Sequence, residues 1–150
     1  RTEMINAYRV ANIESYKANN DVVEGYERLA GHDGRTCSAC LALDGKKFAL
    51  SEPFYYHSNC RCTAIPITAS WADLGITGID EEEPRLAGEA YFESLSVDEQ
   101  KKILGVRGRE LWASGQVEFS DFAHIYNHPN YGMVVQRASI KQALTNAASR

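Results

Sequence analysis

The sequence contains Cys37-Ser38-Ala39-Cys40 and, further along the chain, His57-Ser58-Asn59-Cys60-Arg61-Cys62. These two segments hold every cysteine of the chain and one of its histidines. Thiolate and imidazole are the groups that zinc prefers, and a structural zinc site takes four of them in a tetrahedron. The spacing therefore predicts a zinc site that ties two distant segments of the chain together.

The two segments offer more candidate ligands than one zinc ion can use: Cys37, Cys40, His57, Cys60 and Cys62. In one possible set, Cys37 and Cys40 are joined by His57 and Cys60, so that both pairs have the same short spacing. In the other, they are joined by Cys60 and Cys62, whose side chains leave on one face if that segment is extended. Both sets stay open, and two disulfides in an oxidising compartment are a further alternative.

Composition limits the size and the class of the protein. With 150 residues, 44% of them hydrophobic, the chain can bury one ordinary core, alone or with a small appendage. The formal net charge of −4 argues against a dedicated DNA-binding protein. Neither a signal peptide nor a run of about 18 apolar residues is present, so we expect a soluble, intracellular protein that does not contact a membrane.

Residues 1–67 read as a helix followed by a small antiparallel sheet. Thr2 is expected to cap the helix, whose apolar positions have the spacing of one buried face: Met4, Ile5, Tyr8 and Ala11. Strands are expected where β-branched and aromatic residues gather: 22–30, 46–50 and 63–67. Asp44-Gly45 predicts a hairpin turn before the second of these strands, and Asp33 and Asp44 are expected to bond to their own backbone as turn residues.

Residues 68–87 read as an acidic connector, and residues 88–150 read as a helical region. Ser96 and Glu99 form a capping box at a helix start, and glycines are expected to end two helices: Gly105 and Gly115. Ser120 and Ser139 are further N-cap candidates. The predicted fold class is α+β: an N-terminal helix, a small zinc-clamped antiparallel β module, and then a helical C-terminal part.

The zinc is expected to be structural. A metal bound by three or four thiolates is electron-rich and a poor Lewis acid, and a catalytic zinc keeps an open position for water. No second base or nucleophile accompanies the remaining histidines, so no catalytic residue is predicted and the protein is not expected to be an enzyme.

A weak contact with nucleic acid is also predicted around the cysteines, beside Tyr55 and Tyr56. The cations concerned are Arg35, Lys46, Lys47 and Arg61. Cations next to aromatic rings can bind single strands, but four cations give only a weak, salt-sensitive contact. The alternative function to a structural role is therefore a zinc-ribbon DNA-binding protein or a nuclease-like effector.

Several spaced motifs resemble those of the phage Mu protein F-like minor head family, the phage head morphogenesis proteins. The motifs are Arg1-Thr2-Glu3, Asp33-x-Arg35-Thr36-Cys37-x-x-Cys40, Leu43-Asp44-Gly45 and His57-x-Asn59-Cys60-Arg61-Cys62-Thr63 with Pro66. The resemblance covers residue 1 to about residue 67. The sequence departs from it at Tyr56 and Ser58, where the family commonly has prolines.

The resemblance implies a minor capsid component of a tailed phage or prophage that is needed for head assembly. It implies portal, capsid or scaffold proteins as partners, packaged DNA as a further contact, and a location in the virion or procapsid interior, or in the host cytoplasm during assembly. All five Cys and His positions of the family are retained: Cys37, Cys40, His57, Cys60 and Cys62.

Overall fold

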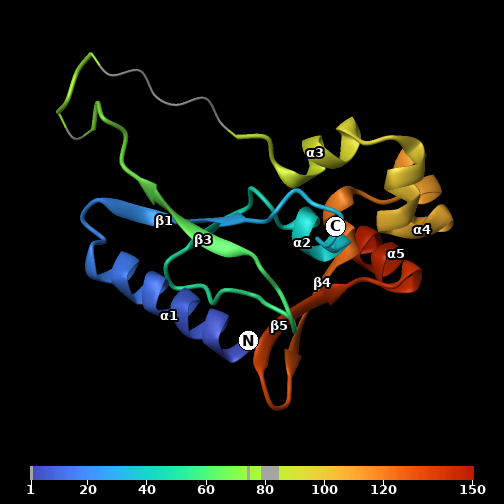
Figure 1. The fold of residues 1–150 in the computed structure, drawn as a ribbon, viewed down its shortest axis with the longest axis horizontal. Coiled ribbons are helices and arrows are strands. Elements are labelled where there is room, and N and C mark those ends of the chain that lie inside the picture. The colour runs from blue at the N-terminus through green and yellow to red at the C-terminus, as the bar shows by residue number, and fades with distance from the viewer. Residues whose placement is uncertain (1, 74, 79–84) are drawn as a thin grey trace.

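The computed structural model describes residues 2–73, 75–78 and 85–150. The helices are α1 (Thr2–Ala18), α2 (Ser38–Ala42), α3 (Gly88–Ser94), α4 (Val97–Ala113) and α5 (Ile140–Ala148), with a 3-10 helix η1 (Phe119–Phe122). The strands are β1 (Val23–Leu29), β2 (Lys47–Ala49), β3 (Thr63–Thr68), β4 (Ala123–His128) and β5 (Gly132–Arg137). Figure 1 shows α1 lying along the sheet of β1 and β3, while α3, α4 and α5 gather at the other end of the molecule. The predicted α+β class is confirmed.

The first sheet is antiparallel and has the order β2-β1-β3. In β1, Tyr26 lies opposite Phe48 of β2 and Pro66 of β3. Side chains alternate between the two faces of a strand, so Tyr26 and Arg28 point to the same face, and both are buried. The three strands expected from residues 22–30, 46–50 and 63–67 are therefore present, with ends that differ by a residue or so.

The helix α1 is present as predicted, but it turns a different face to the sheet. Met4 and Tyr8 are exposed, whereas Arg9 and Ile13 are buried. Arg9 is buried because its guanidinium group finds backbone acceptors inside the protein, so a charged residue takes a position that the apolar pattern had assigned to the solvent face. The prediction that Met4, Tyr8 and Ala11 form the buried face is wrong.

The hairpin expected at Asp44-Gly45 is also wrong, although Gly45 does have a positive φ of 80°. The chain enters this turn from the helix α2, and β2 pairs with β1 instead of with the residues just before the turn. Gly45 has the conformation expected of a turn, but nothing local in the sequence indicated that β1 would supply the partner strand.

The C-terminal region is only partly helical. Ser96 and Ser139 cap α4 and α5, as predicted, and the box expected at Ser96 is complete; Ser139 also forms a capping box, with Gln142. Gly105 breaks α4 with a φ of 77°, and Gly115 follows its end with a φ of 73°. Ser120, however, lies inside η1, whose N-cap is Glu118, and is not a cap.

Between η1 and α5 the chain forms an antiparallel hairpin, β4–β5, which the sequence interpretation missed. The pairing of these strands is local, but β5 is also held from outside: Tyr56 bridges Val134 in parallel, and the amide of Val135 donates to the carbonyl of Tyr56 at 3.1 Å. The position of the hairpin therefore depends in part on Tyr56, which lies between β2 and β3 of the first sheet.

The helix α2 joins the two ends of the molecule. Cys40 packs in a core with Tyr26, Phe54 and Ala64 of the sheet's side. Leu41 and Ala42, the next two residues, pack in a second core formed by the C-terminal elements, with the buried side chains Phe92, Leu104, Leu111, Val117, Phe119, Phe122 and Ala143. A five-residue helix that is buried along its whole length is thus shared by both cores.

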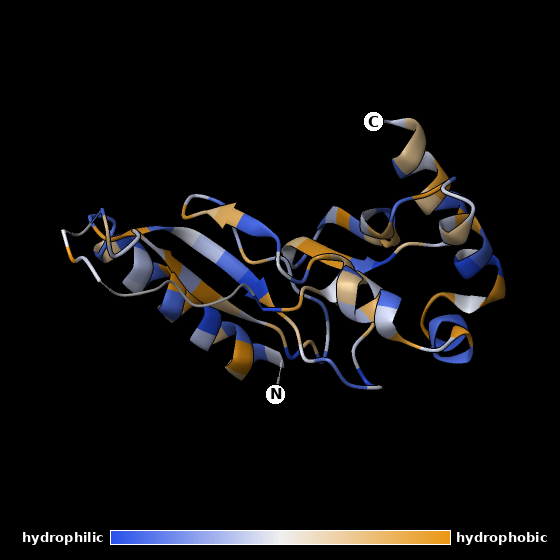
Figure 2. Cartoon of the chain, turned by 90° about the horizontal axis from the view of Figure 1, so that it is seen from above, coloured by the Kyte–Doolittle hydropathy of each residue, from blue (hydrophilic) through white to orange (hydrophobic). Residues whose placement is uncertain are grey.

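The division into residues 1–67, 68–87 and 88–150 remains a prediction. Of the acidic connector, Asp80 to Glu83 lie outside the described residues. Among the residues that the structure describes, no helix has the length and apolar character needed to span a membrane. Figure 2 shows hydrophilic and hydrophobic residues mixed along the helices.

Gly88, at the start of α3, lies against α2 so closely that no side chain fits. A Cβ at this position would lie 2.1 Å from the carbonyl oxygen of Leu41 and 2.8 Å from Cβ of Asp44. We expect Gly88→Ala to lower the free energy of unfolding by about 1–3 kcal/mol, because a packed backbone must move. Urea unfolding measures this, with Gly34→Ala as the control, since nothing lies within 4 Å of a Cβ at Gly34. Equal unfolding midpoints for the two variants would contradict the packing.

Candidate metal centre

The first two candidate ligands lie at the start of α2. Cys37 is its N-cap residue, with an extended backbone (φ −78°, ψ 161°), and Cys40 lies one turn further on. Residues three apart on a helix share a face, so the Cys-x-x-Cys spacing brings the two sulphurs to one side. The Cys-x-x-Cys segment therefore forms the first turn of the buried helix α2.

The other candidates lie on a tight loop before β3. Its backbone turns back through a hydrogen bond from the amide of Cys60 to the carbonyl of His57, at 3.1 Å, and through Asn59, which has a φ of 60°. Asparagine tolerates this left-handed conformation better than most residues do. The turn places His57 and Cys60 on the side that faces α2.

The ligand atoms form two groups that share Cys40. One group is Cys37, Cys40 and His57, the other is Cys40, Cys60 and Cys62, and within each group all atoms lie within 4.8 Å of one another. Nε2 of His57 lies 3.4 Å from Sγ of Cys37 and 3.1 Å from Sγ of Cys40, and the sulphurs of Cys40 and Cys60 are 3.8 Å apart. Sulphurs bound to zinc at about 2.3 Å in a tetrahedron are separated by about 3.8 Å. The cluster could therefore hold a metal ion.

The orientation of the His57 ring fits a ligand. Its Nδ1 lies 2.8 Å from the carbonyl oxygen of Ser58. A carbonyl can only accept, so Nδ1 carries the proton and Nε2 of the neutral ring is left free, facing the sulphurs. A hydrogen bond from the far ring nitrogen to a backbone carbonyl is the usual support of a metal-bound histidine.

When no metal is bound, hydrogen bonds among the thiols shift their pKa values in opposite directions. In the metal-free protein a hydrogen bond from Cys40, together with one from Nε2 of His57 when that ring carries a proton on both nitrogens, lowers the pKa of Cys37 to about 4. The pKa of Cys60 also lies well below the usual range, mainly through its bond with Cys40. The pKa of Cys40 itself is strongly raised, because its proton is held by Cys37 and Cys60. A bound metal would take the place of that shared proton.

Two buried arginines beside the cluster were missed by the sequence interpretation. Nη2 of Arg28 lies 3.6 Å from Sγ of Cys40 and 3.6 Å from Sγ of Cys60. Arg9 donates to the carbonyls of the ligand loop, to that of Cys60 at 2.9 Å and to that of Cys62 at 2.7 Å. A signal did exist for Arg28, because alternation along β1 puts it on the same face as Tyr26.

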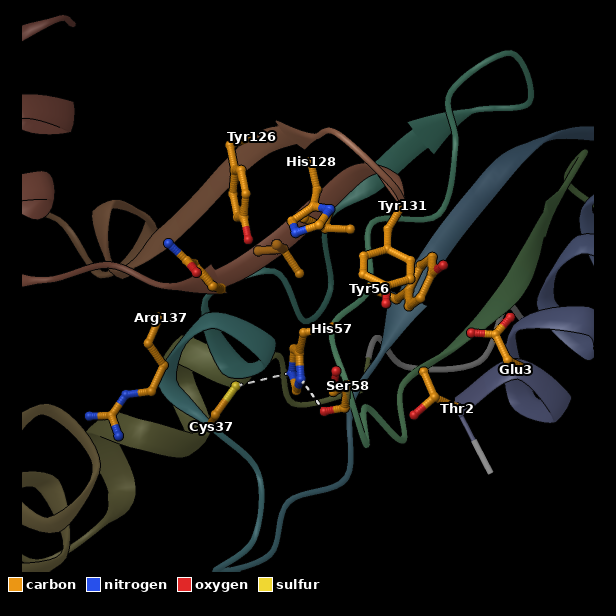
Figure 3. Close-up of a pocket in the computed structure, with 13 residues that line it drawn as sticks. Thr2, Glu3, Cys37, Tyr56, His57, Ser58, Tyr126, His128, Tyr131 and Arg137 are labelled. Carbon is orange, nitrogen blue, oxygen red and sulfur yellow. Dashed lines mark hydrogen bonds between the residues drawn. The ribbon is translucent and has the colours of Figure 1, made fainter.

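One edge of the cluster faces an open cavity of about 610 Å³. Cys37 and His57 line it from one side, and Tyr126, His128 and Tyr131 of the β4–β5 hairpin line it from the other (Figure 3). Cys40, Cys60 and Cys62 are buried behind that edge. A metal held here would be reached by solvent or by a chelator through the Cys37–His57 edge.

All four cysteines are free thiols in this structure, without a disulfide among them.

The cations predicted to contact nucleic acid fall into two places. Arg35 and Arg61 both pair with Asp33, at 3.4 Å and 2.8 Å. Lys46 and Lys47 are exposed around the start of β2, where Lys47 lies opposite Glu27. Each place includes a carboxylate that offsets part of the positive charge, and the contact with nucleic acid remains a prediction.

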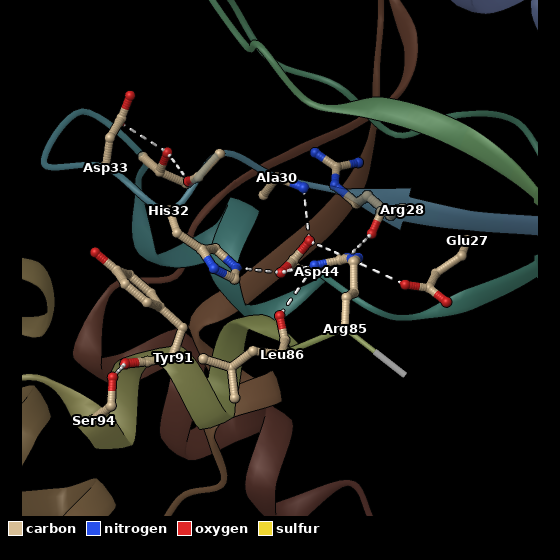
Figure 4. Close-up of polar contacts among 12 residues, drawn as sticks. Glu27, Arg28, Ala30, His32, Asp33, Asp44, Arg85, Leu86, Tyr91 and Ser94 are labelled. Carbon is tan, nitrogen blue, oxygen red and sulfur yellow. Dashed lines mark hydrogen bonds and ion pairs between the residues drawn. The ribbon is translucent and has the colours of Figure 1, made fainter. Parts of the chain in front are cut away.

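A second polar cluster lies on the other side of β1, around Asp44 (Figure 4). The carboxylate of Asp44 is fully buried and accepts hydrogen bonds from the amide of Ala30, from His32 and from both terminal nitrogens of Arg85. Burial raises the pKa of Asp44, but the Arg85 pair and the Ala30 and His32 bonds outweigh it, so its net pKa is lowered. Asp44 is thus a buried ion-pair partner and not the simple turn residue that was expected.

With this geometry in place, the relationship of the chain to known proteins can be stated. Residues 1–65 match the model of a family described as "Phage Mu protein F like protein". The match covers fewer than half of the 150 residues, so it shows that the N-terminal part of the chain is similar to this family. The matched segment contains all five candidate ligands as well as Arg9 and Arg28. Comparison with curated proteins and with solved structures found no match.

The ligand set of the candidate metal centre can be decided by two substitutions. We expect His57→Ala to weaken zinc binding more than about 100-fold, because it removes a ligand that is already oriented, and Cys62→Ser to weaken it by about 10-fold, as for a supporting residue. Competition with a chromogenic chelator measures both affinities. If Cys62→Ser has the larger effect, the set is the one with four thiolates.

Proposed function

We propose that the chain is a structural, non-enzymatic component of a tailed-phage or prophage head, and that a structural zinc fixes its N-terminal module. The role in head morphogenesis is supported by the match of residues 1–65 to the Phage Mu F-like family. The observation that supports the zinc is that two segments bring five thiol and imidazole groups into two groups of three that share Cys40, with the Cys40–Cys60 distance of 3.8 Å suited to a tetrahedral ion.

The number of available protein ligands supports a structural role for the zinc. The cluster has enough protein donors to fill four positions, so none has to be left to water, and three of the sulphurs are buried. The module around it is small: a three-stranded sheet covered on one face by α1. Sheets of this size exclude little water, and a metal contributes most to stability in such a case.

We further propose that the protein acts at the portal or in the procapsid interior, with portal, capsid or scaffold proteins as its partners. The test is co-expression with the portal and the major capsid protein of the same phage, followed by affinity capture and metal analysis. We expect capture of at least one of the two and about one zinc per chain. Capture of neither head protein would overturn the location, and a stable protein without bound metal would overturn the zinc.

A further inference from the structure

Arg28 is a buried charge whose neighbours are sulphurs. Its side chain is 1% exposed, and Nη2 lies at the same distance, 3.6 Å, from the sulphurs of Cys40 and Cys60. Its other terminal nitrogen donates to the carbonyl of Tyr55, and its guanidinium carbon lies 4.6 Å from the centre of the Phe54 ring. These contacts fix the plane of the group and aim one edge at the thiols.

Within the part of the chain that the structure describes, no carboxylate forms an ion pair with Arg28. Burying an unpaired charge is costly, so a buried guanidinium needs an anion beside it. The groups that can supply this charge are the thiols of Cys40 and Cys60, once they are ionised. Metal binding requires that same ionised state.

Resting on the structural zinc proposed above, we propose that Arg28 is a positioning residue of the metal centre. Its guanidinium neutralises the negative charge of a thiolate-rich site by direct contact with the sulphurs of Cys40 and Cys60. A divalent ion with three thiolates and one neutral imidazole carries a single negative charge, which one arginine offsets. Arg28 thus favours a thiolate-rich metal site in an interior that would otherwise disfavour net charge.

The test compares variants of the full 150-residue chain in zinc affinity and in the absorption spectrum of the cobalt-substituted protein. We expect Arg28→Met to fill the same volume but to weaken zinc binding by about 10- to 100-fold, as for other supporting groups of metal ligands. It should also shift the sulphur-to-cobalt charge-transfer band, because the sulphurs lose a hydrogen-bond donor. A purely structural role would not move that band.

Two further variants keep the test decisive. Arg107→Met, at an exposed position on α4, should leave both affinity and spectrum unchanged. Arg28→Lys retains the charge and should restore most of the affinity, even if Arg28→Met folds poorly. An affinity and a spectrum in Arg28→Met equal to those of Arg107→Met would overturn the assignment of Arg28, as would an Arg28→Lys protein no better than Arg28→Met. Absence of zinc from the unaltered chain would instead show that the proposed metal function is wrong.

Discussion

Cys40→Ser is expected to abolish zinc binding and to unfold the N-terminal module. Cys40 is the ligand common to both groups of the cluster, so its loss removes a ligand from either possible set. Structural zinc contributes apparent binding free energies of about 10–16 kcal/mol in zinc-finger peptides, comparable with the whole stability of a domain, about 5–15 kcal/mol. The loss of this term leaves the small sheet without its main support.

Hydrogen exchange followed by mass spectrometry measures this effect locally. Exchange should increase in α1 and in β1, β2 and β3, while α4 and α5 keep their own core, which does not include the cluster. The unaltered protein treated with a strong chelator serves as the control and should reproduce the pattern of Cys40→Ser. A Cys40→Ser protein that still retains one zinc per chain would show that the metal is held elsewhere.

Asp44→Asn is expected to lower the free energy of unfolding by about 3 kcal/mol. The substitution leaves Arg85 without its buried partner, and breaking such a pair from one side costs about 3–5 kcal/mol. We expect the lower end of this range, because Arg85 is 29% exposed and can be partly rehydrated. Glu27→Gln is the matched control: Glu27 contacts the same arginine at 3.2 Å but is partly exposed, and its loss should cost less than about 1 kcal/mol.

The same pair predicts a dependence of stability on pH. The pKa of Asp44 is lower in the folded protein than in the unfolded chain. Its contribution is therefore complete above the unfolded pKa, about 3.9, and is lost as the pH falls through the lower, folded value. Urea unfolding between pH 7 and pH 3 should show this loss in the unaltered protein and a smaller one in Asp44→Asn. Parallel curves would mean that Asp44 is not the group responsible.

The gathering of the candidate ligands could be predicted because ligand spacing is a local property of the sequence. Cys37 and Cys40 share a face on any helical turn, and the close spacing of His57 and Cys60 brings them together on a tight loop. The choice between His57 and Cys62 as the fourth ligand remains a prediction, and the ring orientation that favours His57 could not be read from the sequence. The hydrogen bond to Ser58 that fixes this orientation becomes visible only in three dimensions.

The predictions of the fold were wrong where tertiary contacts override the conformational preference of the local sequence. Arg9 is buried against backbone carbonyls that lie more than fifty positions away in sequence, so no helical pattern could indicate its place. The strand β5 is supported by Tyr56, again far away in sequence. The capping box at Ser96 and the N-cap at Ser139 were predicted correctly, because the groups that form them lie within one helical turn.

The alternation of β1 also limits how this part of the chain can change length. Glu27 points to Arg85 on one face of the strand, and Arg28, the next residue, points to the sulphurs on the other. Inserting or deleting a single residue upstream in the strand would exchange the two faces. A carboxylate would then stand against the thiolates while an arginine faced Arg85, so both clusters would fail together. Natural variation in length should therefore be confined to the loops that flank β1.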